Sequence, residues 1–593
     1  MYLNNLKEVR SSRGTVDVFG GYSHNVRIRD NEFYDMKNLS SDFYPVLSPR
    51  GKRGVHTYAT LGTHSCNGLI DKDGICYVDG TALYINQQAV SGLTLVDSPK
   101  QLISMGAYII ILPDKKYVNT ADLSDYGSIE ASYSSATTVT YELCRPDGTE
   151  YTDATVSPSE PSSPDNGDYW IDTSSVPHTL KQYSASSSVW VTIATTYVKI
   201  KSPGIAAKFG KYDGVKISGI DASLTQLQAL EGQTSLLYGA YHDEEGVGAD
   251  DYIIVVGIID EAATQSSPLT VSRRMPDMDF VIESENRLWG CRYGTNADGE
   301  FVNEIYASKL GDFRNWNSFM GISTDSYIAS VGTDGAFTGA AAHLGYPTFF
   351  KETCMHKVYG NYPSNYQIQT TACRGVMEGC GQSLATVNER LFYKTRTGIA
   401  YYDGSLPVEV SDAFGDIRYT DAVGGSHRNK YYIDMKSEED GKYYLFVFDA
   451  AKGLWHKEDE VRIDYFCSSK GELYYVNHTD KLIHTVMGSG TLDTSPVSWM
   501  AETGMLGTDN PDRKYISQIL VRMSLAIESR VIFYAQYDSA GDWEHLATLA
   551  GLHTRTFSLP IRPKRCDHFR LRIEGMGDAK IYSITKTVEE GGI

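Results

Sequence analysis

The sequence lacks the features of a membrane-spanning or secreted protein. No apolar run approaches the roughly 18 residues that a transmembrane helix needs. The longest apolar runs, Ala107–Leu112 and Tyr252–Ile259, have the length of strands. The N-terminal residues MYLNNLKEVRSSRG contain no apolar signal core. We therefore expect no membrane span, no secretion signal and assembly in a cytoplasm.

Paired cysteines are also missing. The chain has 9 cysteines, an odd number, and no Cys-x-x-Cys pair; the closest spacings are Cys373 with Cys380 and Cys66 with Cys76. This pattern is typical of buried, reduced thiols in a protein of a reducing compartment. We expect neither a disulfide framework nor a structural metal.

Positive charge is scarce. Lys and Arg number 54 against 74 Asp and Glu, which gives a net charge of −20. Tight binding to a phosphate backbone needs clustered cations, so the composition argues against a nucleic-acid-binding protein of the usual kind. A chain of this charge can still lie beside DNA without holding it.

The motifs of the common enzyme classes are absent. There is no Gly-x-Ser-x-Gly nucleophile turn, no phosphate-binding Gly-Lys-Ser/Thr loop and no His-Glu-x-x-His zinc helix. The 14 histidines are scattered, and no pair has metal-ligand spacing inside a helical or tight-turn context. The sequence predicts no catalytic, cofactor-binding or metal-binding residue, no cofactor, and a protein that is not an enzyme.

Two acidic clusters contain residue types that can bind a cation. Asp71-Lys72-Asp73-Gly74 resembles the start of a calcium loop but lacks the later ligands, which favours a hairpin turn. The other cluster favours a solvated loop. It consists of His242, Asp243, Glu244, Glu245, Asp250 and Asp251. A pair of carboxylates for glycoside cleavage remains open, because 74 acidic residues allow many pairs in space.

Tyrosine and glycine are abundant. There are 42 Tyr and 54 Gly. Tyrosine favours half-buried pleated surfaces and glycine favours turns, so the composition predicts an all-β protein.

Seven stretches share an alternating strand, a polar or Gly turn and an aromatic-rich strand. Six Asp-Gly pairs, a strong hairpin signal, punctuate them. Short repeated antiparallel sheets are typical of propeller blades, since one small sheet cannot bury its faces alone. The sequence therefore predicts a β-propeller of about 6–8 blades, with ordinary sandwich strands as the alternative. The stretches are 64–88, 98–120, 279–309, 326–360, 382–410, 420–456 and 461–487.

Residues 121–275 break this pattern. A Ser- and Pro-rich loop at 153–166 leads into further strand-like segments. Ser223–Glu231 is a helix candidate, with Ser223 and Gln226 as a capping box. We interpret 121–275 as a β-rich domain inserted between the second and third blades.

Six evenly spaced strand candidates follow residue 489 and predict a C-terminal β-sandwich. Arg562, Lys564, Arg565, Arg570 and Arg572 form a basic cluster there, either a solvated edge or a docking surface for an acidic neighbour. The predicted organisation is an N-terminal segment leading into the propeller (1–55), first blades (56–120), inserted domain (121–275), second group of blades (276–488) and sandwich (489–593).

Several segments resemble β-propeller proteins of tailed bacteriophages. The N-terminal stretch 17–54 reads DVFGGYSHNVRIRDNEFYDMKNLSSDFYPVLSPRGKRG and resembles the first segment of tail hub or nozzle proteins, also called packaged-DNA stabilisation proteins. NRLWGC with EIYASKLGDFRNWNSF, then FFKETCMHKVYGNYP and RLFYKTRTGIAYYDGSLPVEVS, are similar to their blades, and RPKRCDHFRLRIEGMGDAKIYSI is similar to their terminal sandwich. The resemblance covers roughly 15–55 and 275–590.

This resemblance implies a structural protein of the virion. Copies of the chain, six in our expectation, would form a homo-oligomeric ring in the phage tail. The ring would lie between a portal or adaptor above and fibres or a needle below. It would line the ejection channel and retain packaged dsDNA, which passes without specific binding. Two alternatives stay open: a receptor- or glycan-binding propeller at the tail tip, and a glycosidase.

Overall fold

The computed structural model describes residues 11–56, 66–243, 248–508 and 513–590. Strands dominate these residues, and the helical elements are four short 3-10 turns, so the prediction of an all-β fold is confirmed. No helix in the described ranges is long and apolar enough to cross a membrane. The chain divides into two compact units, Met1–Lys100 with Phe337–Lys357 and Thr370–Ile593, and Gln101–Ala336 with Val358–Gln369.

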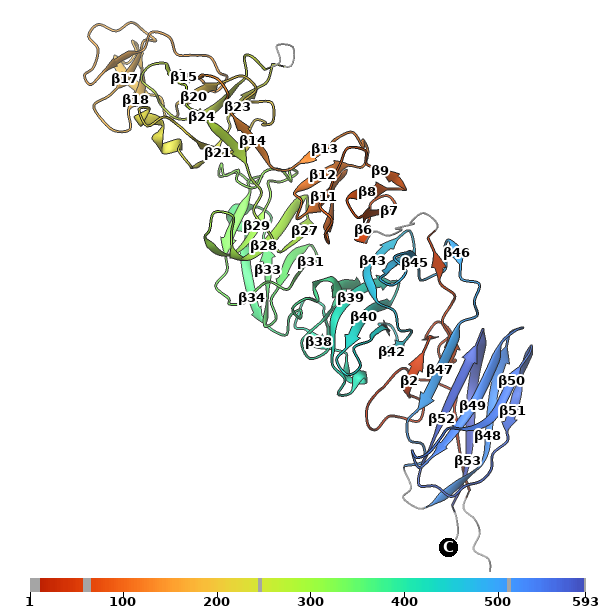
Figure 1. Cartoon of the computed structure of the whole chain (residues 1–593). Helices are drawn as coiled ribbons and strands as arrows, with labels where there is room; N and C mark the ends of the chain where they lie inside the picture. The colour runs from red at the N-terminus through yellow and green to blue at the C-terminus, as the bar shows by residue number, and fades with distance from the viewer. Residues whose placement is uncertain (1–10, 57–65, 244–247, 509–512, 591–593) are drawn as a thin grey trace, which may run out of the picture. The chain divides into compact units, whose positions relative to one another are not determined.

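Outside the segment between β13 and β27, six sheets of the described ranges have four strands in the consecutive order of propeller blades, and a seventh differs only in that β5 lies between its third and last strands (Figure 1). The first three come from two separate stretches of sequence. They are β6 (Cys66–Asp71), β7 (Ile75–Asp79), β8 (Ala82–Ile85) and β9 (Gln88–Ala89); β10 (Gln101–Met105), β11 (Tyr108–Leu112), β12 (Lys116–Asn119) and β13 (Tyr126–Ser128); and β27 (Phe280–Ser284), β28 (Arg287–Thr295), β29 (Phe301–Ala307) and β30 (Tyr327–Ser330).

The other four sheets follow one another along the chain. They are β31 (Gly339–His343), β32 (Tyr346–Phe350), β33 (Cys354–Tyr359) and β34 (Gln367–Ala372); β35 (Ala385–Val387), β36 (Arg390–Lys394), β37 (Ile399–Tyr402) and β38 (Val408–Glu409); β39 (Tyr419–His427), β40 (Lys430–Ser437), β41 (Tyr443–Asp449) and β42 (Leu454–Lys457); and β43 (Ile463–Ser469), β44 (Glu472–Asn477), β45 (Ile483–Thr485) and β46 (Thr491–Leu492), joined by β5 (Gly54–Val55).

The burial pattern of these sheets explains their sequence pattern. Second strands such as β7, β11 and β36 are buried on both faces, whereas fourth strands such as β9 and β46 are exposed. A strand buried on both faces reads as a continuous apolar run, which is what face-to-face packing of small sheets requires. The predicted segment 326–360 spans parts of two sheets, because the loop after β29 delays β30 to Tyr327.

Neighbouring sheets pack face to face inside each unit. In one unit β35 contacts β39, β39 contacts β43, and β43 contacts β6. In the other unit β10 contacts β27. The aromatic core of the first group is dense: the Phe414 ring lies 4.8 Å from Phe446 and 4.9 Å from Trp455, centroid to centroid.

The N-terminal segment contacts two of the blade-like sheets of its unit. Its strand β5 pairs with both β45 and β46, so the last blade-like sheet contains a strand from the start of the chain. Further upstream, Tyr22 donates its backbone N–H to the Trp455 carbonyl at 2.6 Å. Gly21 is required at this contact, because a Cβ there would lie 2.2 Å from the same carbonyl oxygen.

The segment between β13 and β27 forms three sheets around its own apolar core (Figure 1). The strands are β14 (Ala131–Ser134), β26 (Thr270–Arg273), β21 (Gly214–Ser218) and β22 (Thr234–Leu236); β23 (Gly239–Tyr241), β24 (Tyr252–Val256), β20 (Tyr197–Lys201), β15 (Val139–Cys144) and β25 (Ala263–Gln265); and β16 (Thr155–Ser157), β17 (Tyr169–Asp172), β18 (Thr179–Ser184) and β19 (Val189–Thr192). β13 still belongs to a blade-like sheet, beyond the predicted limit at residue 120.

The C-terminal strands form two facing sheets, and each of the six predicted segments is a strand. The N-terminal strands β1 and β2 complete the two sheets, which local sequence could not show. One sheet contains β1 (Ser11–Val16), β53 (Ala579–Glu590), β48 (Lys514–Leu525) and β51 (His553–Leu559). The other contains β2 (Phe33–Lys37), β47 (Ser498–Thr503), β52 (Phe569–Met576), β49 (Arg530–Tyr537) and β50 (Glu544–Ala550). A short pair, β3 (Leu39–Ser40) and β4 (Ser48–Pro49), precedes β5.

The predicted helix at Ser223–Glu231 is a 3-10 turn, η1 (Thr225–Leu230), without a side-chain cap. The predicted capping box is wrong because its side chains bind elsewhere: Ser223 donates to Asp221 and Gln226 donates to Asp260. The other 3-10 turns are η2 (Pro363–Asn365), η3 (Gly381–Ser383) and η4 (Asp412–Phe414).

Candidate functional site

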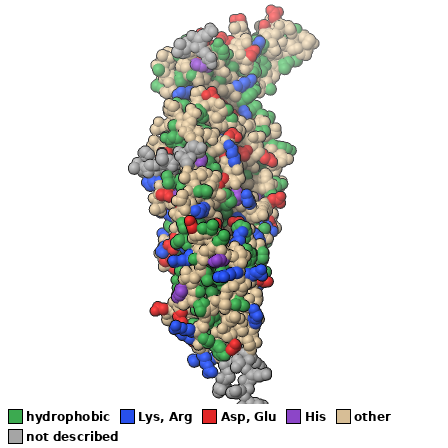
Figure 2. Space-filling model, turned by 90° about the vertical axis from the view of Figure 1, so that its right-hand side faces the viewer, with side chains coloured by type: hydrophobic (Ala, Val, Ile, Leu, Met, Phe, Trp, Pro, Cys, Tyr) green, Lys and Arg blue, Asp and Glu red, His purple; other side chains and the backbone are tan. Residues whose placement is uncertain are grey.

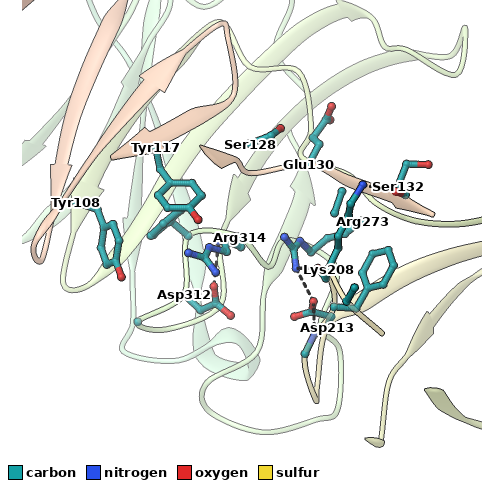
Figure 3. A pocket seen from close by; sticks show the side chains of 16 residues that line it. Tyr108, Tyr117, Ser128, Glu130, Ser132, Lys208, Asp213, Arg273, Asp312 and Arg314 are labelled. Atoms are coloured by element: carbon teal, nitrogen blue, oxygen red, sulfur yellow. Dashed lines mark hydrogen bonds and ion pairs between the residues drawn. The ribbon is translucent and has the colours of Figure 1, made fainter. Parts of the chain in front are cut away.

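A cavity of about 920 Å³ lies where two blade-like sheets meet the inserted strands, all within the second unit (Figure 3). Its volume falls in the range of sites for small ligands. The lining comes from six separate stretches of sequence. The residues are Tyr108, Tyr117, Ser128, Glu130, Ala131, Ser132, Ala207, Lys208, Phe209, Gly210, Asp213, Arg273, Gly311, Asp312, Phe313 and Arg314.

One wall of the cavity is aromatic. Tyr108 on β11 and Tyr117 on β12 lie 5.8 Å apart, and each ring is within 5.3 Å of Phe313 from the loop after β29. Gly127 pairs with Tyr117 across β12 and β13, and a Cβ at Gly127 would lie 3.3 Å from the Tyr117 hydroxyl. The glycine therefore leaves room for the Tyr117 ring to lie over the neighbouring strand.

The opposite wall is fixed by a buried ion pair. The Arg273 guanidinium on β26 lies 2.5 Å from the Asp213 carboxylate, and both side chains are 8% exposed. Arg273 also donates to the Ile129 carbonyl, and Asp213 accepts from the Asn315 amide at 3.0 Å. A buried charged pair with further hydrogen bonds holds its groups in one geometry. This network fixes the inserted strands against the loop that carries Phe313 and Arg314.

The rim of the cavity carries further polar groups. Lys115, beside the cavity, forms ion pairs with Glu130 at 2.9 Å and with Asp277 at 2.8 Å. Burial alone would lower the pKa of Lys115, but its hydrogen bonds with the two carboxylates raise it. Burial and the Asp125 carboxylate raise the pKa of Tyr108, so its hydroxyl stays protonated.

The arrangement suits a ligand with both apolar faces and hydroxyl groups. Aromatic rings offer flat apolar area, and serines, carboxylates and cations offer hydrogen bonds of both kinds. Sequence reasoning missed every residue of this site, since they are far apart in the chain. The dense run Gly311-Asp312-Phe313-Arg314 between two strands was the local signal that could have drawn attention to it.

The first predicted acidic cluster is a hairpin turn. Asp73 and Gly74 have positive φ angles of 58° and 145° between β6 and β7. Asp71 accepts from the Ser469 hydroxyl at 2.7 Å, and Lys470 donates to the Asp73 carbonyl. These contacts tie two neighbouring sheets together and leave the turn with a structural role.

The second acidic cluster does not converge on one point. His242 lies 2.7 Å from the fully buried Asp251, which also accepts from the Asp243 and Ala206 backbone N–H groups. Asp250 binds Lys201 instead. Glu244 and Glu245 lie outside the described residues. Among the residues that the structure describes, no group of three or more His, Cys, Asp or Glu side chains could hold a metal ion.

One pair of carboxylates is linked through a single lysine. Lys199 lies 3.7 Å from Glu142 and 3.0 Å from Glu150. Burial, followed by the neighbouring Glu150, raises the pKa of Glu142, whereas hydrogen bonds from Lys199 and Glu142 lower that of Glu150. Opposite shifts are typical of acid–base pairs. Neither glutamate lines the cavity of about 920 Å³ described above.

The basic cluster of the sandwich is largely neutralised within the same domain. Arg570 and Arg572 both bind Glu502, and Lys564 binds Glu544. Figure 2 shows basic and acidic side chains interspersed over one face of the molecule. These pairs favour the solvated-edge interpretation over a docking surface.

No protein-family model and no curated protein matches the chain. Solved structures do match the chain, with low TM-scores. An exo-beta-1,3-galactanase from Phanerochaete chrysosporium in complex with galactose has a TM-score of 0.22 and 8% identity, over 52% of this chain and 94% of that chain. A glycoside hydrolase has a TM-score of 0.20 and 11% identity, over 51% and 96%. PorZ, a surface component of the type-IX secretion system of Porphyromonas gingivalis, has a TM-score of 0.16 and 10% identity, over 89% and 77%.

These neighbours overturn one prediction. The sequence-based prediction that the chain is not an enzyme is wrong, because glycoside hydrolases are among the structures that it matches with high probability. With TM-scores of at most 0.22, the same matches assign no reaction and no substrate to this chain.

Proposed function

We propose that the chain is a receptor- or glycan-binding propeller protein of a bacteriophage tail, and that the cavity of Figure 3 holds the glycan. The observation that carries the proposal is the combination of the Tyr108 and Tyr117 rings with polar side chains around about 920 Å³. A sugar ring can lie against a tyrosine face while its hydroxyls bind carboxylate, serine and cationic groups.

The rigidity of the site supports binding. Arg273, Asp213 and Asn315 fix the two halves of the lining before any ligand arrives, and Phe313 packs in the core with an exposed fraction of 5%. A preformed site loses little conformational entropy when its ligand binds.

The decisive test is a glycan array probed with the wild-type chain and two cavity variants. Ser128→Trp fills the cavity from the exposed end of β13, and Tyr117→Ala removes one aromatic face. We expect both to abolish binding of the glycans that the wild type retains. Tyr84→Ala is the control, since Tyr84 stacks on Tyr77 in another sheet and does not line the cavity.

The outcomes separate cleanly. If no glycan binds the wild type, or if Ser128→Trp and Tyr117→Ala bind as the wild type does, the proposal is wrong. The same incubations are assayed for newly formed reducing ends, because release of them would show that the bound glycan is also cleaved.

The place in a phage tail rests on the sequence resemblance of residues 17–54 and of the blade and sandwich segments. We propose assembly in the host cytoplasm and incorporation into the virion tail. Mass spectrometry of purified virions tests this directly, and absence of the chain from intact particles would reject it.

A second candidate is the hub or nozzle ring that lines the DNA channel. The observation that favours it is the net charge of −20, which would repel phosphates and let dsDNA pass without adsorption. In this version six copies form the ring between portal or adaptor and fibres or needle. Electron cryomicroscopy of virions separates the two candidates: axial density supports the ring, and peripheral copies support the receptor-binding role.

A further inference from the structure

Some charges that line the cavity of Figure 3 already have partners of opposite sign. Arg273 is neutralised by Asp213 at 2.5 Å. Glu130 is paired with Lys115 at 2.9 Å. The Arg273–Asp213 pair therefore contributes little net charge to a ligand in the cavity. Lys115 also pairs with Asp277 at 2.8 Å, so it compensates the charge of Glu130 only in part.

Two cations of the lining have no carboxylate partner within 4.0 Å among the described residues: Lys208 and Arg314. The ammonium group of Lys208 donates to the Ser132 carbonyl at 3.3 Å, which leaves its charge uncompensated. The Arg314 guanidinium lies 4.4 Å from the Tyr117 ring centroid and 5.5 Å from that of Phe313. Stacking on two aromatic rings holds the guanidinium in place without neutralising it.

The remaining carboxylate of the lining, Asp312, is occupied by neutral donors. It accepts from the Arg314 backbone N–H at 3.1 Å and from the Asn315 side-chain amide. These bonds fix the turn that presents Arg314. Neutral donors leave the charge of Asp312 in place, so the lining has two cations without a carboxylate partner and one carboxylate without a cationic partner.

We propose that the ligand of this cavity is an acidic glycan, whose sugar carboxylate binds Arg314 and Lys208 while a ring lies on the tyrosine wall. This inference rests on the proposed function and narrows its ligand class. A guanidinium matches a carboxylate with two parallel hydrogen bonds, and a pre-stacked guanidinium loses little entropy when it forms them. A neutral glycan offers the two cations only hydroxyl acceptors, whose hydrogen bonds are weaker than those of a carboxylate.

The test uses carboxylated oligosaccharides and their methyl esters, which differ mainly in charge. Oligogalacturonate, oligoglucuronate and sialyllactose are titrated into the full chain by calorimetry, each beside its ester. We expect at least one acid to bind tenfold or more tightly than its ester, and its affinity to fall as salt is raised. Arg314→Met and Lys208→Met should each weaken that binding about tenfold. Lys211→Met is the matched control, because Lys211 is an exposed cation near Lys208 that does not line the cavity.

Each result decides a different point. Equal affinity for acids and esters, with Ser128→Trp blocking both, overturns the acidic class and leaves glycan binding intact. Binding of acids that Arg314→Met and Lys208→Met do not weaken overturns the assignment of the two cations. Failure of the acids to bind while neutral array glycans bind at the cavity also rejects this inference, whereas failure of every glycan rejects the proposed function itself.

Discussion

The ion-pair network of Arg53 is expected to hold the N-terminal strand β5 in the last blade-like sheet. Arg53 is 8% exposed; its guanidinium lies 2.6 Å from Glu458 and 2.8 Å from Asp459, and it covers the Tyr475 ring at 5.3 Å. Arg50 reinforces the network at 3.6 Å from Glu458 and 3.2 Å from Asp459. The perturbation is Arg53→Met, which keeps an apolar stem of similar length but removes the charge.

The expected cost is about 3 kcal/mol. Removing one partner of a buried ion pair costs about 3–5 kcal/mol, because the other charge stays buried without compensation. In the variant, Arg50 still pairs with Glu458 and Asp459, so we expect a cost near the lower limit of this range. The change corresponds to a roughly hundredfold rise in local opening, since about 1.4 kcal/mol equals a factor of ten.

The effect should depend on pH. Burial alone would raise the pKa of Asp459, but Arg53 and Arg50 outweigh it and lower the pKa. A carboxylate with a lowered pKa in the folded state contributes stability above its unfolded value of about 3.9 and loses it as pH falls through the folded pKa. Arg53→Met should therefore have its full effect at neutral pH, and the effect should shrink as the pH falls below about 4 toward the folded pKa of Asp459.

Hydrogen exchange read by mass spectrometry is the assay, on peptides that cover β5, β45 and β46. Arg53→Met combined with Glu458→Gln should recover part of the loss, because the amide no longer leaves a buried charge. Arg396→Met, on an exposed turn, is the control. If Arg53→Met and Arg396→Met give the same exchange in these peptides, the network does not hold β5 and the reasoning fails.

Three further predictions concern the same unit. Burial, reinforced by Lys430, lowers the pKa of His456 to about 3, so below about pH 6.5 the unfolded chain binds a proton at this histidine that the folded chain does not bind. The free energy of unfolding should therefore fall by about 1.4 kcal/mol per pH unit because of this group. His456→Gln should make the stability measured by urea unfolding less dependent on pH in this acidic range. Gly21→Ala should lower stability by about 3 kcal/mol, because its Cβ would lie 2.2 Å from the Trp455 carbonyl oxygen, whereas Gly51→Ala, with no atom within 4 Å, should be neutral in the same melts. Glu502→Gln should destabilise the sandwich by about 2–4 kcal/mol because it leaves Arg570 and Arg572 without their shared carboxylate, while Glu544→Gln at an exposed pair should cost under about 0.5 kcal/mol; equal effects in calorimetry would contradict the burial argument.

The sequence by itself determined the strand content and the repeated sheets. Continuous apolar runs such as Ala107–Leu112, aromatic strands and Asp-Gly turns are local signals, and each reflects a strand buried on two faces or a two-residue hairpin. The six C-terminal segments were visible for the same reason, since alternation along β48 has a period of two.

Only the tertiary structure decided which distant residues meet. β1 and β2 join C-terminal strands, and β5 joins the last blade-like sheet, through pairings that span hundreds of residues and leave no local pattern. The cavity draws Tyr117, Lys208, Arg273 and Arg314 from separate segments, and the partners that neutralise Arg273 but not Arg314 are set by packing. Local sequence encodes the period of a strand; the charge that a folded surface presents depends on which neighbours the chain brings within bonding distance.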